Sequence, residues 1–349
     1  AMSACVGAGA AGGRVATATS SQGLALMIEV LYQASGMRIP AVLCLVNRAL
    51  AAPLNVNGDH SDLYLTRDSG WISIDAFCPQ EAYDMTLMAF KISEHPDVRL
   101  PVISNQDGFM TSHTAQNVIP LEDKVACDFV GPYLQVNALL NFDKPVTHGV
   151  QTEQDWHFEH KAKQHAALMG SKKVILETFA QFKELTGREY KLVESYNLEN
   201  ADVAIVCLGT TYETAILAIN QLKEEGINAA VVAPRVFRPF PLEEVAEALQ
   251  NVKAVACMDR SAPGGTVGTL YNEVSGALFN TPARPLMSNL IYGLGGRDMT
   301  VAGLKDIFRN LDKEAKAGKL SGKIQRFIGV RGPELSFYDA QGDVKWVVL

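Results

Sequence analysis

Short apolar runs alternate with segments of helical periodicity through the first third of the chain. Residues 40–47 are almost wholly apolar, which is typical of a strand covered on both faces of a sheet. This alternation predicts a parallel sheet flanked by helices, and therefore an α/β fold. We expect strands at 14–19, 40–47, 71–77 and 100–104, and helices at 23–34 and 79–93.

A second block of the same alternation runs from residue 202 to about residue 296. Its strands recur about every 25 residues, which is the size of a βα unit. Between the blocks, 159–185 predicts a long polar helix across a surface between domains, with a possible interruption at Gly170. In the second block we expect strands at 203–209, 227–236, 252–259 and 286–296, and helices at 212–225, 242–250 and 266–278; the tail carries a helix at 304–317 and an extended end at 344–349.

The length of 349 residues fits two domains and a smaller piece, at roughly 150 residues per domain. We expect an α/β domain over 1–140, a connector and long helix over 141–200, a second α/β domain over 201–300, and a tail over 301–349.

Composition and charge exclude several classes of protein. Lys and Arg number 31 against 38 Asp and Glu, so the net charge of −7 argues against nucleic-acid binding. No apolar run approaches the ~20 residues of a membrane span. The six cysteines are scattered and form no CxxC motif, which indicates a reducing compartment and no locally built metal or iron–sulfur site. We expect a cytoplasmic protein.

A glycine motif near the start matches GxGxxG at Gly7, Gly9 and Gly12, with Glu29 at nearly the spacing of a ribose-binding acid. A dinucleotide fold would use it to bring a pyrophosphate to a helix N-terminus. No convincing strand precedes it, and close packing of small residues explains the glycines equally well. An NAD-dependent dehydrogenase therefore stays open as an alternative.

Arg48 directly follows the apolar run 40–47. Ligands of open parallel sheets bind at the carboxyl edge of the strands, where an arginine can fork onto a carboxylate. A structural ion pair or a helix-capping contact is the alternative. Ser20, Ser21 and Gln22 lie between an expected strand and helix, where they can cap the helix or meet a ligand.

Three further groups have a functional and a structural interpretation. The cluster 58–62, which includes Asp59, His60 and Asp62, resembles a metal or acid/base site, although a helix cap at Asp59 or Ser61 and a polar turn residue at His60 explain it better. His113 follows a strand end and could act as a base. Arg235 and Arg238 could bind an anion, but the neighbouring prolines and aromatic residues favour an interface.

Several of these motifs together, in one order over residues 1 to about 300, resemble the alpha-type subunits of pyruvate:ferredoxin oxidoreductase, in the thiamine-diphosphate-dependent 2-oxoacid oxidoreductase family. The resembling segments are TATSSQGLALM (17–27), NRALAAPLNVNGDHSD (47–62), Gln80–Glu81, DGFMTSH (107–113), GTTYETA (209–215), VFRPFP (236–241), MDRSAPGG (258–265) and YGLGGRD (292–298).

The resemblance implies a pyrimidine-binding domain over 1–140 and a transketolase C-terminal-like domain over 201–300. It makes Arg48 the contact for the substrate carboxylate and places Ser20, Ser21 and Gln22 near the cofactor. It also puts the glutamate that activates the aminopyrimidine, and a substrate-facing threonine, upstream of residue 1. We therefore expect the first domain to be incomplete at its N-terminal end.

The activity implied is oxidative decarboxylation of pyruvate with coenzyme A to acetyl-CoA and carbon dioxide, reducing ferredoxin, or the reverse synthesis. The resemblance implies thiamine diphosphate with Mg²⁺ shared with a partner chain, and [4Fe-4S] clusters only on partner chains. The partners implied are a beta-type thiamine-diphosphate/iron–sulfur subunit, a gamma-type subunit, a ferredoxin-like delta subunit and ferredoxin itself.

Other members of the family stay open as alternatives. In the oxalate-cleaving branch an acidic residue follows the arginine, whereas residues 49–53 here are Ala-Leu-Ala-Ala-Pro. Relatives that act on branched-chain acids or 2-oxoglutarate depart from the RALA pattern. From a different class, the chain could be a non-catalytic scaffold fragment.

Overall fold

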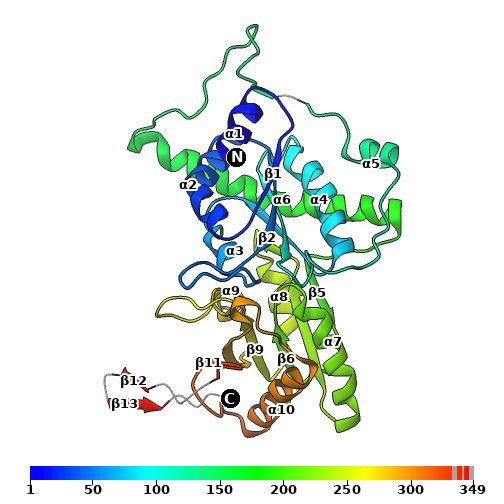
Figure 1. The fold of residues 1–349 in the computed structure, drawn as a ribbon, viewed down its shortest axis with the longest axis vertical. Coiled ribbons are helices and arrows are strands. Elements are labelled where there is room, and N and C mark those ends of the chain that lie inside the picture. Colours follow the sequence, from blue (N-terminus) through cyan, green and yellow to red (C-terminus); the bar gives the residue numbers. More distant parts are fainter. Residues whose placement is uncertain (135, 332–335, 340–341, 346–349) are drawn as a thin grey trace. The chain divides into compact units, whose positions relative to one another are not determined.

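The computed structural model describes every residue except 135, 332–335, 340–341 and 346–349, and it describes no side chains from 332 onward. The chain divides into two compact units, which are described separately (Figure 1). Unit 1 comprises Ala1–Glu194, Leu208–Thr210 and Ala233–Glu244; unit 2 comprises Ser195–Cys207, Thr211–Val232 and Val245–Leu349.

The sheet of unit 1 has the strand order β1-β2-β4-β3-β8. Its first four members are parallel, as the alternation of the sequence predicts, and β8 runs antiparallel to β3. The strands are β1 (Ala16–Thr19), β2 (Val42–Asn47), β3 (Ile72–Ala76), β4 (Val102–Asp107) and β8 (Val236–Arg238).

Helices α4 and α6 contribute to one hydrophobic core with β3. Ile72 and Ile74 of β3 belong to the same buried cluster as Met88 of α4 and Ile175 and Phe179 of α6. The helix α6 is continuous through Gly170, so the interruption considered there does not occur. The helices of unit 1 are α1 (Met2–Ala10), α2 (Gln22–Gly36), α3 (Ser61–Leu65), α4 (Pro79–Glu94), α5 (Asp123–Val130) and α6 (Gln154–Thr186).

The glycine motif near the N-terminus lies in a helix rather than in a nucleotide-binding turn. Gly7 and Gly9 belong to α1, and Gly12 follows it before β1. A dinucleotide motif needs the reverse order, strand then helix, so the dinucleotide interpretation is wrong. Close packing explains Gly9, because a Cβ atom there would lie 2.5 Å from Cγ2 of Ile39.

The second sheet has the order β11-β10-β9-β6-β7-β5. The pairs from β11 to β7 are parallel. Helices α7 and α10 cover it, with Ile219, Leu222, Phe308 and Leu311 in one buried cluster. Its strands are β5 (Val193–Tyr196), β6 (Val203–Val206), β7 (Ala229–Pro234), β9 (Ala254–Asp259), β10 (Leu286–Ile291) and β11 (Gln325–Phe327).

The strand expected at 286–296 ends at Ile291, because Gly293, Gly295 and Gly296 have positive φ and form a 3₁₀ turn instead. The remaining elements lie mostly in segments that the sequence predicts, except β12. They are α7 (Thr211–Leu222), η1 (Lys223–Glu225), α8 (Leu242–Leu249), α9 (Thr269–Phe279), η2 (Leu294–Gly296), α10 (Val301–Ala317), β12 (Ser336–Asp339) and β13 (Gly342–Lys345). Of the extended end expected at 344–349, the first two residues belong to β13 and 346–349 lie outside the described residues.

One expected strand, 227–236, is in fact two. β7 ends at Pro234, and β8 begins at Val236 in the sheet of unit 1. Between them, Arg235 is 2% exposed and paired with carboxylates of unit 1. This buried ion pair explains why the apolar run does not continue as one strand.

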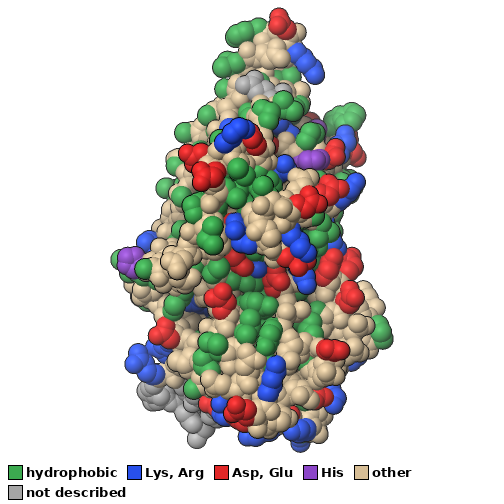
Figure 2. Space-filling model, turned by 90° about the vertical axis from the view of Figure 1, so that its right-hand side faces the viewer, with side chains coloured by type: hydrophobic (Ala, Val, Ile, Leu, Met, Phe, Trp, Pro, Cys, Tyr) green, Lys and Arg blue, Asp and Glu red, His purple; other side chains and the backbone are tan. Residues whose placement is uncertain are grey.

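The surface agrees with the composition. On the face shown in Figure 2, basic and acidic side chains are interspersed. None of the described helices combines the length and the apolar character required to cross a bilayer.

Candidate functional site

The candidate residues gather at the carboxyl edge of the first sheet. Asn47, the last residue of β2, pairs in register with Asp107, the last residue of β4. β1, on the other side of β2, ends at Thr19 and leads into Ser20. Because parallel strands end on the same side, the segments after β1, β2 and β4 meet there. The sequence therefore placed Arg48 and the Ser20–Gln22 turn at one edge correctly.

Arg48 is half-buried, and its main chain is fixed while its side chain is not paired. Its backbone N–H donates to Oδ2 of Asp62 at 3.0 Å. Its Nε is fully buried and has no hydrogen-bond partner, and the guanidinium forms no ion pair with a residue that the structure describes. A buried guanidinium nitrogen without an acceptor is costly. The arrangement fits a site that receives an anionic or carbonyl-bearing group.

The turn from β1 into α2 has an unusual backbone. Ser21 is completely buried, with φ 53° and ψ −126°, a region that residues with a Cβ rarely adopt. It occupies the N-cap position, but its hydroxyl donates to the carbonyl of Ala49 and makes no capping hydrogen bond. The capping interpretation is therefore wrong for Ser21. Ser20 is half-buried, and its carbonyl accepts from Gly23 N at 3.0 Å.

The amide of Gln22 has a buried atom without a partner. Its side chain lies 2.6 Å from the hydroxyl oxygen of Ser21, and its other amide atom is buried and unpaired. The single Ser21 proton is used on Ala49, so the Gln22 NH₂ group must face Ser21. The amide oxygen of Gln22 is then the unpaired atom, available to a donor on a ligand.

Asp62 connects the turn after β1 to the end of β2. The sequence indicated it only as a member of the cluster 58–62. Its Oδ2 accepts from the backbone N–H groups of Ser21 at 2.8 Å and Arg48 at 3.0 Å. Its Oδ1 accepts from Asn47 Nδ2 at 3.0 Å and Leu63 N at 2.8 Å. Burial raises the pKa of Asp62 to about 6, against the effect of these four donors. Only long-range geometry identifies it.

The rest of that cluster is structural. His60 is 1% exposed, and its Nε2 lies 2.6 Å from Oδ1 of Asp107, so it is not the polar turn residue that the sequence suggested. Oδ2 of Asp107 accepts from the N–H and the hydroxyl of Thr210 at 2.9 and 2.6 Å. Oδ1 of Asp59 accepts from Ser61 N at 3.0 Å. Within the described residues, no group of three or more His, Cys, Asp or Glu is arranged to hold a metal.

Arg235 has a structural role and does not bind an external anion. Its guanidinium pairs with Glu81 at 2.7 Å and with Glu194 at 3.2 Å. It lies 4.2 Å from the ring centroid of Phe77 and 5.0 Å from that of Tyr190. All of its charge is balanced inside unit 1, which excludes it as an anion site.

The other candidates, Arg238 and His113, share no hydrogen bond or ion pair with Arg48 in the described part of the chain. Arg238 donates through Nε to the carbonyl of Arg67 at 3.0 Å. His113 is exposed, with its ring centroid 5.5 Å from that of Phe109. Its ring makes no hydrogen bond to a described residue, so nothing orients it as a base.

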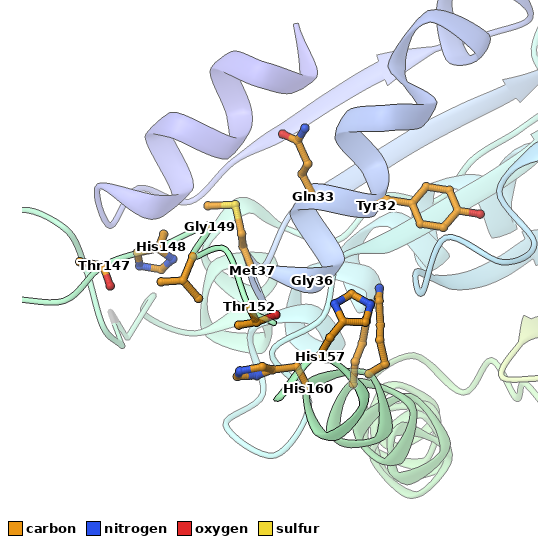
Figure 3. A pocket seen from close by; sticks show the side chains of 13 residues that line it. Tyr32, Gln33, Gly36, Met37, Thr147, His148, Gly149, Thr152, His157 and His160 are labelled. Atoms are coloured by element: carbon orange, nitrogen blue, oxygen red, sulfur yellow. The ribbon is translucent and has the colours of Figure 1, made fainter. Parts of the chain in front are cut away.

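A large cavity of about 740 Å³ lies away from this edge. Figure 3 shows Gly36, the last residue of α2, and Met37 after it on one side of the cavity, with His157 and His160 of α6 on another. None of the candidate residues at the carboxyl edge lines it, so it is separate from the site.

Residues 1–180 match the family model described as the thiamine diphosphate-binding domain of pyruvate flavodoxin/ferredoxin oxidoreductase. Residues 201–304 match core domain II of pyruvate:ferredoxin oxidoreductase. The chain belongs to the pyruvate:ferredoxin oxidoreductase family.

Named relatives agree with the family. The pyruvate synthase subunit PorA of Thermotoga maritima is 43% identical over 331 residues, which is 95% of this chain and 83% of that protein. The ketoisovalerate oxidoreductase subunit VorA of Pyrococcus horikoshii is 39% identical over 326 residues, 93% of this chain and 82% of that protein.

The fold has a solved counterpart. The 2-oxoglutarate:ferredoxin oxidoreductase of Magnetococcus marinus aligns with a TM-score of 0.62 and 21% identity. The alignment covers 90% of this chain and 55% of that one. At this identity the match supports the fold alone.

Proposed function

We propose that this chain is the alpha-type subunit of a pyruvate synthase and that it holds the carboxylate of pyruvate through Arg48. The complex oxidises pyruvate with coenzyme A to acetyl-CoA and carbon dioxide and reduces ferredoxin, or runs in reverse. The observation that carries the proposal is the half-buried Arg48 side chain at the carboxyl edge of the sheet: its Nε is buried, and it has no ion-pair partner among the described residues.

The chemistry requires a fixed cation beside the substrate. Thiamine diphosphate, when bound, supplies the electron sink for loss of the carboxylate. Arg48 can bind that carboxylate with two parallel hydrogen bonds and orient it. The unpaired Gln22 amide and the half-buried Ser20 fit the polar side of the cofactor. The residues present therefore suit the thiamine-binding domain that the family description names.

The remaining parts of the site are assigned to partner chains. We propose that a beta-type subunit holds the diphosphate, its Mg²⁺ and [4Fe-4S] clusters, and that gamma-type and ferredoxin-like delta subunits complete the assembly. The relatives' names as subunits support a complex. We place it in the cytoplasm, because the cysteines of the described chain are all free thiols.

A branched-chain 2-oxoacid is the second candidate substrate. The similarity to VorA is close to that to PorA, at 39% against 43% identity. The small residues Ala49, Ala51 and Ala52 after the arginine carry no charge, which argues against oxalate or 2-oxoglutarate. Comparing kcat/KM for pyruvate, 2-oxoisovalerate, 2-oxoglutarate and oxalate in the purified complex decides among them. We expect the highest value for pyruvate.

The test of the site is Arg48→Gln in the complete complex. Loss of a charged partner for a desolvated carboxylate costs about 2–5 kcal/mol, so KM for pyruvate should rise roughly 30-fold or more. The control is Arg67→Ala, which removes a half-exposed arginine paired with Asp68. We expect this control to keep normal kinetics. Normal pyruvate kinetics in Arg48→Gln would overturn the proposal.

A further inference from the structure

We propose that Asp62 is a positioning residue: its carboxylate locks the main chain of Arg48 and the Ser21–Gln22 turn into one arrangement, so that both face the substrate together. This inference rests on the proposed function of Arg48. Asp62 itself does not touch the substrate, and it acts through the backbone groups that it binds.

One side chain joins three segments that are distant in sequence. Asp62 lies in the first turn of α3, and it contacts the turn after β1 and the end of β2. Each carboxylate oxygen accepts two hydrogen bonds at 2.8 to 3.0 Å. Moving this carboxylate therefore moves Ser21 and Arg48 in concert.

The backbone of Ser21 supplies an independent reason. A residue with a side chain at φ 53° and ψ −126° costs on the order of 1–3 kcal/mol. The surroundings hold it there: Asp62 accepts its N–H and the Ala49 carbonyl accepts its hydroxyl. Strain of this kind persists where the structure fixes it and often accompanies function. Here it sets the direction in which Gln22 starts α2.

Unpaired polar atoms surround the anchored segments. The buried atoms without a partner include Nε of Arg48, one amide atom of Gln22 and Oδ1 of Asn47. Each belongs to a residue that Asp62 binds or that adjoins one it binds. Asp62 thus fixes the main chain and leaves these atoms for a ligand.

All four groups that face the Asp62 carboxylate are hydrogen-bond donors. The charge-neutral variant Asp62→Asn therefore tests whether these four hydrogen bonds position Arg48. In Asp62→Asn the NH₂ group must face two N–H donors in either orientation of the amide. The variant keeps the size of the side chain, but it leaves two buried N–H groups without an acceptor, so it affects stability as well as alignment. We expect Arg48 to shift while unit 1 stays folded.

The experiment compares Asp62→Asn, Arg48→Gln and the double variant in the complete complex, with Asp68→Asn as the matched exposed control. We expect Asp62→Asn to raise KM for pyruvate roughly tenfold or more while the complex still assembles, with a melting temperature below that of wild type because two buried N–H groups lose their acceptor. The double variant should be no worse than Arg48→Gln, because residues that act as one unit are not additive.

The outcomes separate this inference from the proposed function. Normal kinetics of Arg48→Gln overturns the proposed function. A large effect of Arg48→Gln with an unchanged KM in Asp62→Asn, or with additive effects in the double variant, overturns the positioning role alone. If Asp62→Asn does not assemble, Asp62→Glu is used in the same comparison. This variant keeps the charge but displaces it by one methylene, so we expect a KM for pyruvate between those of wild type and Arg48→Gln.

Discussion

The backbone of Arg48 is bound to Oδ2 of Asp62 at 3.0 Å, whereas the guanidinium of the same arginine has no anionic partner in the part of the chain that is described. The arginine is therefore held at one end and available at the other. Substitutions that change the head group but keep the backbone in place are therefore the most informative tests of this residue.

We expect Arg48→Lys to bind pyruvate more weakly than wild type but better than Arg48→Gln. Lysine keeps the positive charge but lacks the planar fork that binds a carboxylate with two parallel hydrogen bonds. Steady-state kinetics of the complex should give a KM about tenfold above wild type, given roughly 1–2 kcal/mol for one lost charge-assisted bond. A lysine variant as weak as the glutamine variant would contradict this.

The stability of unit 1 should depend on pH through Asp75. Burial raises the pKa of this carboxyl to about 7, with His60 and Arg235 lowering it and Asp107 raising it further. The folded chain thus holds the proton more tightly than the unfolded chain. The stabilisation is complete below about pH 4 and is lost as the pH rises through 7.

The variant Asp75→Asn isolates this effect from that of other carboxylates. Relative to the variant, wild type should lose on the order of 3 kcal/mol of unfolding free energy between pH 5 and pH 8. Denaturant unfolding of the purified chain, followed by tryptophan fluorescence at both pH values, measures the difference. An equal difference at both values would show that Asp75 is ionised throughout.

Arg235→Met should destabilise unit 1 strongly. The change leaves Glu81 and Glu194 without their buried partner, which costs about 3–5 kcal/mol. The control is Arg309→Ala, whose ion pair with Glu225 lies at the surface, so its loss should leave the stability close to that of wild type. Unfolding midpoints of both variants make the comparison; similar midpoints would contradict it.

Two glycines should respond oppositely to alanine. A Cβ atom at Gly108 would lie 1.9 Å from the carbonyl oxygen of Asn47, so Gly108→Ala must displace the backbone beside Arg48. We expect both lower stability and a higher KM for pyruvate. At Gly170, inside α6, a Cβ atom meets nothing within 4 Å, so Gly170→Ala should stabilise by up to about 1 kcal/mol. A neutral Gly108→Ala variant would be inconsistent with the packing of this edge.

The spacing of apolar residues predicted most of the helices and strands, because each of them buries its apolar side chains at the period typical of a helix or a strand. It placed β1, β2, α2 and α4 within two residues of their observed ends and put Arg48 at the carboxyl edge. The glycine motif was misleading without its structural context: Gly7 and Gly9 belong to a helix of small residues, and of the two only Gly9 is closely packed.

The features that sequence could not predict depend on pairs far apart in the chain. His60 meets Asp107 across 47 positions, and Arg235 meets Glu81 across 154. These contacts decide that His60 is buried and that β7 ends where it does. The role of Asp62 could not be predicted for the same reason, because three of its four donors, on Ser21, Asn47 and Arg48, lie far from it in the chain and no local spacing reveals them.

The hydrogen bonds of Asp62 fix the residues that follow β1 and β2. Between Arg48 and Asp62 the chain carries the exposed side chains of Leu54 and Val56, which are 75% and 51% accessible. Because Asp62 and not these exposed side chains holds the main chain of Ser21 and Arg48, substitutions at Leu54 and Val56 should leave the arginine where it is.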